Sequence, residues 1–196
     1  MWHIILFAFA SVASIGPTNL YAINNGLKKG AKTTFWILIG GVITDLFYAH
    51  LAGIGAILFF SNAKVQIVMM ITGVTLFGYF GYKNIRNIFI DGQYQADIEN
   101  KRLNPILIGL LMTLPNPFSI FMWAAAFVSY KINYTPIALS VIIISVGIGW
   151  AIIESATVHI LKKNITNSIY KVIDGSTGII LVVFAIRMAI KIFAMM

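Results

Sequence analysis

Six apolar stretches dominate this chain and leave few folds open to it. They cover roughly residues 2–25, 34–60, 65–82, 105–129, 136–160 and 172–193. Each is long enough to cross about 30 Å of hydrocarbon as an α-helix. None alternates as the strands of a membrane barrel do, and only a helix satisfies its own backbone hydrogen bonds within one segment in lipid. The sequence therefore predicts an all-α integral membrane protein with six transmembrane helices.

The composition supports this prediction and excludes several classes of protein. Hydrophobic residues make up 59% of the 196 residues and charged residues only 10%, whereas soluble domains carry about 25% charged residues. The net charge of +8 indicates basic loops beside a membrane rather than binding of nucleic acid. Because the chain has no cysteine, disulfides, thiolate metal sites and iron–sulfur clusters are excluded.

Basic residues concentrate in alternate connections between the apolar stretches. The connections after the first, third and fifth stretches hold Lys28, Lys29, Lys32, Lys83, Arg86, Lys101, Arg102, Lys162, Lys163 and Lys171. The other side holds Lys64, Lys131, Lys191 and Arg187 near the end of the last stretch. Because cytoplasmic loops are enriched in Lys and Arg, the odd-numbered connections are predicted to be cytoplasmic and both termini to lie outside.

The longest polar stretch divides the chain into two halves. Residues 1–82 form the first predicted three-helix repeat, 83–104 a cytoplasmic connecting loop, and 105–196 the second three-helix repeat. Because three is an odd number, the second half would enter the membrane from the opposite side. This is the inverted-repeat plan of many secondary transporters.

Proline interrupts the first and fourth predicted helices at matching positions. The first contains Gly16, Pro17, Thr18 and Asn19, and the fourth contains Pro115, Asn116 and Pro117, with Ser119 following. Proline removes one backbone donor and frees the carbonyl four residues earlier. A half-helix that starts at such a break presents N–H groups and a positive dipole end suited to a carboxylate, while freed carbonyls suit an ammonium group. A zwitterionic amino acid fits both, although the prolines are also compatible with simple kinks.

Two acidic residues within apolar stretches, Asp45 and Glu154, are candidates for function. Asp45 sits near the middle of the second stretch, where a carboxylate costs about 2.5–3.5 kcal/mol to insert. It is interpreted as a proton carrier or as the counter-charge of a substrate amine, with a structural hydrogen bond to another helix as the alternative. Tyr48 shares its helix face. Glu154 lies nearer the cytoplasmic end of the fifth stretch, where water is expected to reach it. A functional role as a gate or proton site and a role in a solvated structural pair fit it equally well.

Two rival functions use the same polar residues. A divalent metal ion would need ligands that converge from different helices, and these could be Asp45, Glu154, His50 and His159. Export of such an ion is therefore the alternative function. No ligand spacing indicates a metal site. A membrane-embedded enzyme using these groups as acids and bases is less favoured, and no phosphate loop or hydrolase motif is present. We expect no enzyme activity and no cofactor.

Several short motifs, in order, resemble those of the LysE/RhtB amino-acid exporters. Gly16-Pro17-Thr18-Asn19 is similar to the Gly-Pro-x-Asn segment of that family, and 26–30 to its Gly-Leu-basic-x-Gly turn. The segment 40–45 resembles the glycine-rich approach to an aspartate in the second span, 109–121 the segment containing Asn-Pro and aromatic residues, and Trp150 a tryptophan of the fifth span. The resemblance covers nearly the whole chain.

This resemblance implies a gradient-driven exporter of amino acids in a bacterial inner membrane. The deeply placed carboxyl of Asp45 makes protons the expected coupling ion. Two departures from the family pattern bear on the substrate: Phe118 replaces a frequent Lys, and Gly147 replaces a frequent Asp. The buried acids slightly favour a cationic substrate such as lysine or arginine, while basic and small neutral amino acids both stay open. The oligomeric state stays open, a homodimer included. The candidate substrate-binding or translocation residues are Gly16, Pro17, Thr18, Asn19, Asp45, Asn116, Pro117 and Glu154.

Overall fold

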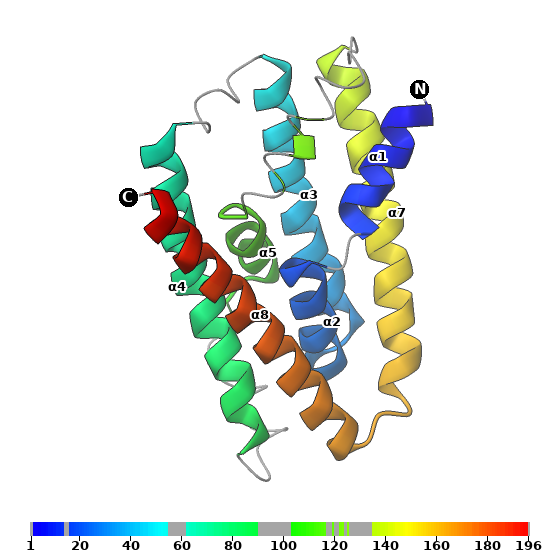
Figure 1. Ribbon diagram of the computed structural model, residues 1–196. Helices are drawn as coiled ribbons and strands as arrows, with labels where there is room; N and C mark the ends of the chain where they lie inside the picture. The colour runs from blue at the N-terminus through cyan, green and yellow to red at the C-terminus, as the bar shows by residue number, and fades with distance from the viewer. Residues whose placement is uncertain are drawn as a thin grey trace.

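The chain folds into helices throughout the part that the structure describes (Figure 1). The computed structural model describes residues 2–13, 16–54, 62–89, 103–116, 119, 122–123, 125 and 135–195. In these residues the helices are α1 (Trp2–Ala13), α2 (Pro17–Lys29), α3 (Ala31–Gly53), α4 (Ala63–Ile88), α5 (Pro105–Thr113), α7 (Pro136–Lys162) and α8 (Asn167–Met195). The prediction of an all-helical chain is confirmed for this part. Most of the expected loop 83–104, and Pro117, lie outside it.

Four helices are long and apolar enough to cross a membrane. They are α3, α4, α7 and α8, and a fifth span arises if α1 and α2, which meet at an angle of 56°, count as one. Large apolar side chains cover the outer surfaces of these helices, among them Ile152, Ile153 and Ile190. These features are typical of a multi-pass membrane protein, while the six-helix inverted repeat stays a prediction.

Local sequence signals set where several helices begin. The side chains of Asn62, Asn104 and Thr135 accept hydrogen bonds from backbone N–H groups in the first turns of α4, α5 and α7. Pro105 and Pro136 occupy first helical positions, where no backbone donor is needed. Between α2 and α3, Gly30 has a φ of 105°, a conformation that glycine adopts without strain.

Paired glycines let neighbouring helices approach closely enough for their backbones to be in contact. A Cβ added to Gly40 of α3 would collide with the Ile106 carbonyl of α5, and one added to Gly109 of α5 would collide with the Ile37 carbonyl of α3. Gly81 and Gly178 make the corresponding close contact between α4 and α8, the pair of helices with the most extensive packing. Small residues at these crossings are typical of packing between membrane helices.

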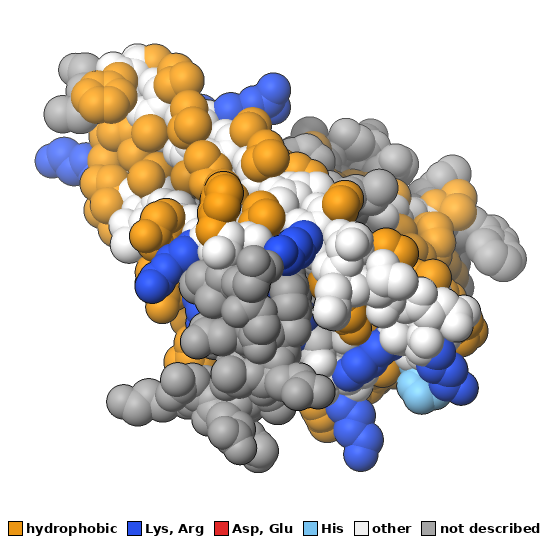
Figure 2. Space-filling model, turned by 90° about the horizontal axis from the view of Figure 1, so that it is seen from below, with side chains coloured by type: hydrophobic (Ala, Val, Ile, Leu, Met, Phe, Trp, Pro, Cys, Tyr) orange, Lys and Arg blue, Asp and Glu red, His pale blue; other side chains and the backbone are white. Residues whose placement is uncertain are grey.

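The basic residues gather at one end of the molecule, as their alternation in the sequence predicts. We define this basic end by the last turns of α2, α4 and α7 and the start of α8, which lie together at the bottom of Figure 1. Figure 2, which views the molecule from this end, shows several Lys and Arg side chains and no acidic side chain of the described residues. Both termini lie toward the opposite end. Which side of the membrane the basic end faces remains the prediction made from the sequence.

Candidate functional site

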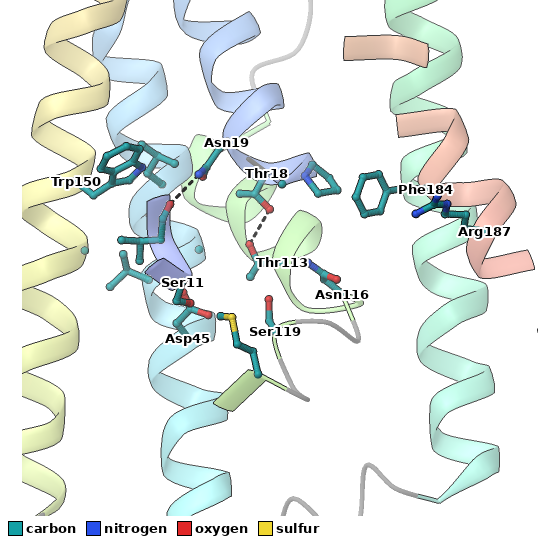
Figure 3. A pocket seen from close by; sticks show the side chains of 18 residues that line it. Ser11, Thr18, Asn19, Asp45, Thr113, Asn116, Ser119, Trp150, Phe184 and Arg187 are labelled. Atoms are coloured by element: carbon teal, nitrogen blue, oxygen red, sulfur yellow. Dashed lines mark hydrogen bonds between the residues drawn. The ribbon is translucent and has the colours of Figure 1, made fainter. Parts of the chain in front are cut away.

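A cavity of about 400 Å³ lies among α1, α2, α3, α5, α7 and α8. Six of the eight predicted site residues line it, namely Gly16, Pro17, Thr18, Asn19, Asp45 and Asn116. The other described lining residues are Ser11, Val12, Leu38, Gly41, Val42, Thr113, Ser119, Met122, Gly147, Trp150, Phe184 and Arg187. Figure 3 shows how the polar members converge from different helices. Pro117 lies outside the described residues.

The first break forms one wall of this cavity. Helix α1 ends at Ala13 and α2 starts at Pro17, with Gly16 as its N-cap and no capping hydrogen bond from a side chain. The Asn19 side-chain amide donates to the Val12 carbonyl at 2.7 Å, so a residue of α2 satisfies a carbonyl in the last turn of α1. Residues 16–19 line the cavity, so the positive dipole end of α2 lies at its wall.

The second break lies beside the first. Helix α5 ends at Thr113, before the first of the two prolines, and the hydroxyl of Tyr48 donates to the Leu114 carbonyl in the turn that follows. The Thr18 and Thr113 hydroxyls are 3.0 Å apart and hydrogen-bonded. This bond joins the start of α2 to the end of α5, so the two interruptions predicted from the prolines meet in space.

Asp45 projects into the cavity from the middle of α3. Leu38, Gly41, Val42 and Asp45 lie on one face of the helix, as a spacing of three or four residues requires, and all line the cavity. Asp45 is 7% exposed, and its Oδ1 atom accepts a hydrogen bond of 3.2 Å from Nε1 of the buried Trp123. Because a carboxylate offers about four acceptor positions, this bond orients Asp45 and leaves it able to bind a further cation or proton.

Glu154 differs from Asp45 in position. It lies on α7 one turn beyond Trp150, does not line the cavity, and is 6% exposed, so the expectation that water reaches it is not met. Its Oε1 atom is buried without a hydrogen-bond partner among the described residues.

The histidines do not join either carboxylate. His50 places one ring nitrogen 2.8 Å from the Leu46 carbonyl and the other 3.2 Å from the Ser140 hydroxyl, so it links α3 to α7. His159 is exposed on the last turn of α7. In the part of the chain with described coordinates, no three His, Asp or Glu side chains are placed to hold a metal ion.

Sequence reasoning missed two charged residues of α8. It assigned Arg187 to the outer end of the last span, but α8 continues to Met195 and Arg187 lines the cavity. Asp174 was overlooked. It is fully buried, and its Oδ1 atom lies 2.5 Å from the Lys28 ammonium. An acidic residue just inside the last apolar stretch, after a basic loop, was the available signal for such a pair.

Known proteins resemble this chain over most of its length. Residues 9–192 match the family model described as LysE type translocator. A Bacillus subtilis (strain 168) protein named "Putative amino acid efflux protein YcgF" is 23% identical over 193 residues, which cover 92% of this chain and 90% of that protein. No solved structure matches.

Proposed function

Because the chain belongs to the LysE type translocator family, whose members are transporters and not enzymes, we propose that it exports amino acids from the cytoplasm in exchange for protons. The observation that carries this proposal is the cavity at the meeting point of two broken helices, with Asp45 in its wall. The related Bacillus subtilis protein is named for amino acid efflux. In this proposal the basic end faces the cytoplasm of a bacterial cell and both termini lie outside.

The chemistry of the cavity fits a zwitterion. The start of α2 lines the cavity, and the positive end of its dipole favours a carboxylate. Asp45 supplies the opposite charge. An intramembrane carboxylate that faces a cavity is typical of substrate and proton pathways.

One carboxylate accounts for the exchange. The ionised form of Asp45 attracts the ammonium group of the substrate, whereas the protonated form does not. Proton and substrate then compete for the same group, so a proton arriving from outside displaces the amino acid and is carried inward. Trp123 keeps the carboxylate oriented in both states because its indole N–H donates to either form.

Purified protein in liposomes tests this function directly. A proton gradient is imposed, and movement of labelled lysine, arginine, threonine, homoserine, leucine and a divalent metal ion is measured. We expect gradient-dependent transport of an amino acid together with proton movement in the opposite direction. Transport of the metal alone would contradict the proposal, as would amino-acid transport that is indifferent to the proton gradient.

A further inference from the structure

A seam between α2 and α8 leads from the cavity to the basic end. Four residues of α2 share one helix face because they are three or four positions apart, namely Pro17, Tyr21, Asn24 and Lys28. Pro17 lines the cavity, and Lys28 lies in the last turn, beside Asp174 of α8. This face of α2 therefore connects the cavity with the basic end.

Helix α8 provides the opposite wall of the seam. Its residues at the same spacing are Asp174, Thr177, Leu181 and Phe184, of which Phe184 lines the cavity. Because α8 starts at the basic end and α2 ends there (Figure 1), the two faces meet in reverse order. Thr177 is one turn from the ion pair on α8, as Asn24 is on α2.

An apolar layer closes the seam next to the cavity. Tyr21 and Leu181 are buried in one hydrophobic cluster together with Phe80 of α4. The rings of Tyr21 and Phe80 make an edge-to-face contact, with their centroids 4.9 Å apart. Packed side chains thus separate the cavity from the basic end along this seam.

A polar layer follows toward the basic end. Asn24 and Thr177 are buried there. Asn84 of α4, one turn beyond Phe80, is buried as well. The side-chain nitrogens of Asn24 and Asn84 have no acceptor among the described residues. Buried amides without partners are costly in a permanent interface, so this layer suits a surface that water reaches at some stage.

Helices α4 and α8 form a unit that is lightly attached to the rest of the molecule. They pack on each other more extensively than any other pair, whereas α8 packs on α2 and α4 on α5 much less. Such a unit can move as a rigid body. Polar contacts hold it to α2 at the basic end, namely the Lys28–Asp174 pair and the hydrogen bond from Tyr170 to the Leu27 carbonyl.

We infer that this seam is the gate at the basic end of the transport path, with the Lys28–Asp174 pair as its latch. When α4 and α8 move away from α2, the pair separates and the polar layer lines a water-filled passage to the cavity. The inference rests on the proposed export function, since a carrier exposes one central site to each side in turn. The pair suits a latch because its attraction is strong while it is buried, whereas water solvates both charges once they are apart.

Thiol labelling in membrane vesicles tests whether the seam opens. The chain has no cysteine, so Thr177→Cys places a single reporter in the polar layer. A membrane-impermeant thiol reagent should reach this reporter only from the side of the basic end. Replacing the latch with Lys28→Met and Asp174→Asn together should raise the labelling rate at least about tenfold, because the open state is otherwise a minor population.

Thr34→Cys is the matched control for the reporter. Thr34 is fully buried on α3, and its hydroxyl donates to the Ala22 carbonyl of α2, away from the seam. Its labelling should stay slow with and without the latch. An unchanged rate at Thr177→Cys in folded protein would overturn the inference. An equal rise at Thr34→Cys would overturn it too, because it would indicate general loosening.

A reducible crosslink provides a second test. A bifunctional thiol reagent that joins Lys28→Cys to Asp174→Cys should hold the seam closed, so amino-acid transport in liposomes should stop and return after reduction. The control crosslink joins Ile88→Cys to Gly175→Cys within the α4–α8 unit, where the shortened side chain at 88 leaves room for a Cβ at 175. It should leave transport unchanged.

The outcomes separate the gate from the proposed function. Transport that survives the crosslink between positions 28 and 174 would overturn the gate while leaving export intact. Wild-type protein that moves no amino acid would contradict the export function instead, and the labelling rates would still decide whether the seam opens.

Discussion

The two ends of α2 differ in how their backbone groups are satisfied. At its start, Gly16 and Pro17 face the cavity and no side chain caps the first turn. At its end, the carbonyls of Leu27 and Lys28 accept hydrogen bonds from Tyr170 of α8 at 2.9 Å and from Lys162 of α7 at 3.1 Å.

An ion pair adds to the contacts at the second end. Lys28 lies 2.5 Å from Asp174, and the exposed fractions of the two side chains are 15% and 0%.

Every helix leaves four N–H groups at its start and four carbonyls at its end without partners in the helix. In α2, side chains of α7 and α8 satisfy carbonyls at the basic end, whereas the start of the helix lines the cavity. Changes at the cavity should therefore alter transport, and changes at the basic end should alter stability.

The largest effect is expected at Asp45. Asp45→Asn keeps an acceptor for Trp123 but cannot take up a proton, so proton-driven transport should be abolished while the melting temperature stays nearly unchanged. Glu154→Gln makes the same chemical change at a buried position outside the cavity and should lower the rate no more than about twofold. Amino-acid uptake into acid-loaded proteoliposomes measures the transport rates of the two variants. Asp45→Asn with wild-type rate and pH dependence would remove the proton role of Asp45.

A large effect on stability is expected at Lys28. Lys28→Met removes the ammonium group that lies 2.5 Å from the buried Asp174 carboxylate, which should cost about 3–5 kcal/mol and lower the melting temperature by on the order of 10 °C. The double variant with Asp174→Asn removes both charges and should recover most of that loss. Thermal unfolding in detergent, followed by tryptophan fluorescence, measures the difference. Equal destabilisation by the single and double variants would contradict a role for the pair.

A moderate effect on transport is expected at Gly41. A Cβ added there would lie 3.4 Å from the Thr113 hydroxyl and 3.8 Å from the Thr18 methyl, so Gly41→Ala narrows the cavity without a clash. Leucine transport should fall up to about tenfold relative to alanine transport, with no loss of stability. Gly149→Ala is the control, because nothing lies within 4 Å of the added methyl group. A uniform loss for both substrates would argue against a steric effect in the cavity.

The smallest effect is expected at Tyr170. Tyr170→Phe removes the hydrogen bond to the Leu27 carbonyl and should cost about 1 kcal/mol, a shift in melting temperature of about 2–4 °C. The same change at Tyr82, which is exposed on α4, should shift it less. Thermal unfolding again provides the measurement, and indistinguishable shifts for the two variants would show that this bond does not hold the end of α2.

The sequence by itself determined the features that lipid imposes locally. Hydrocarbon requires each spanning segment to satisfy its own backbone, so the apolar stretches marked the helices. Pro17 and Pro115 marked places where helices stop, because proline removes a donor wherever it stands. The alternation of basic connections indicated which helix ends share one side. The depth of Asp45 in an apolar stretch marked it as a candidate site residue.

The tertiary structure decided which side chains meet. Thr18 contacts Thr113, 95 residues away, and Asp45 contacts Trp123, 78 residues away. Such contacts depend on the rotation and crossing of whole helices, which glycine pairs such as Gly40 and Gly109 set through backbone contact. Helical spacing shows which residues share one face but not which neighbour that face meets. For this reason only the fold could separate Asp45 in the cavity from Glu154 outside it, and could reveal Arg187 and the Lys28–Asp174 pair.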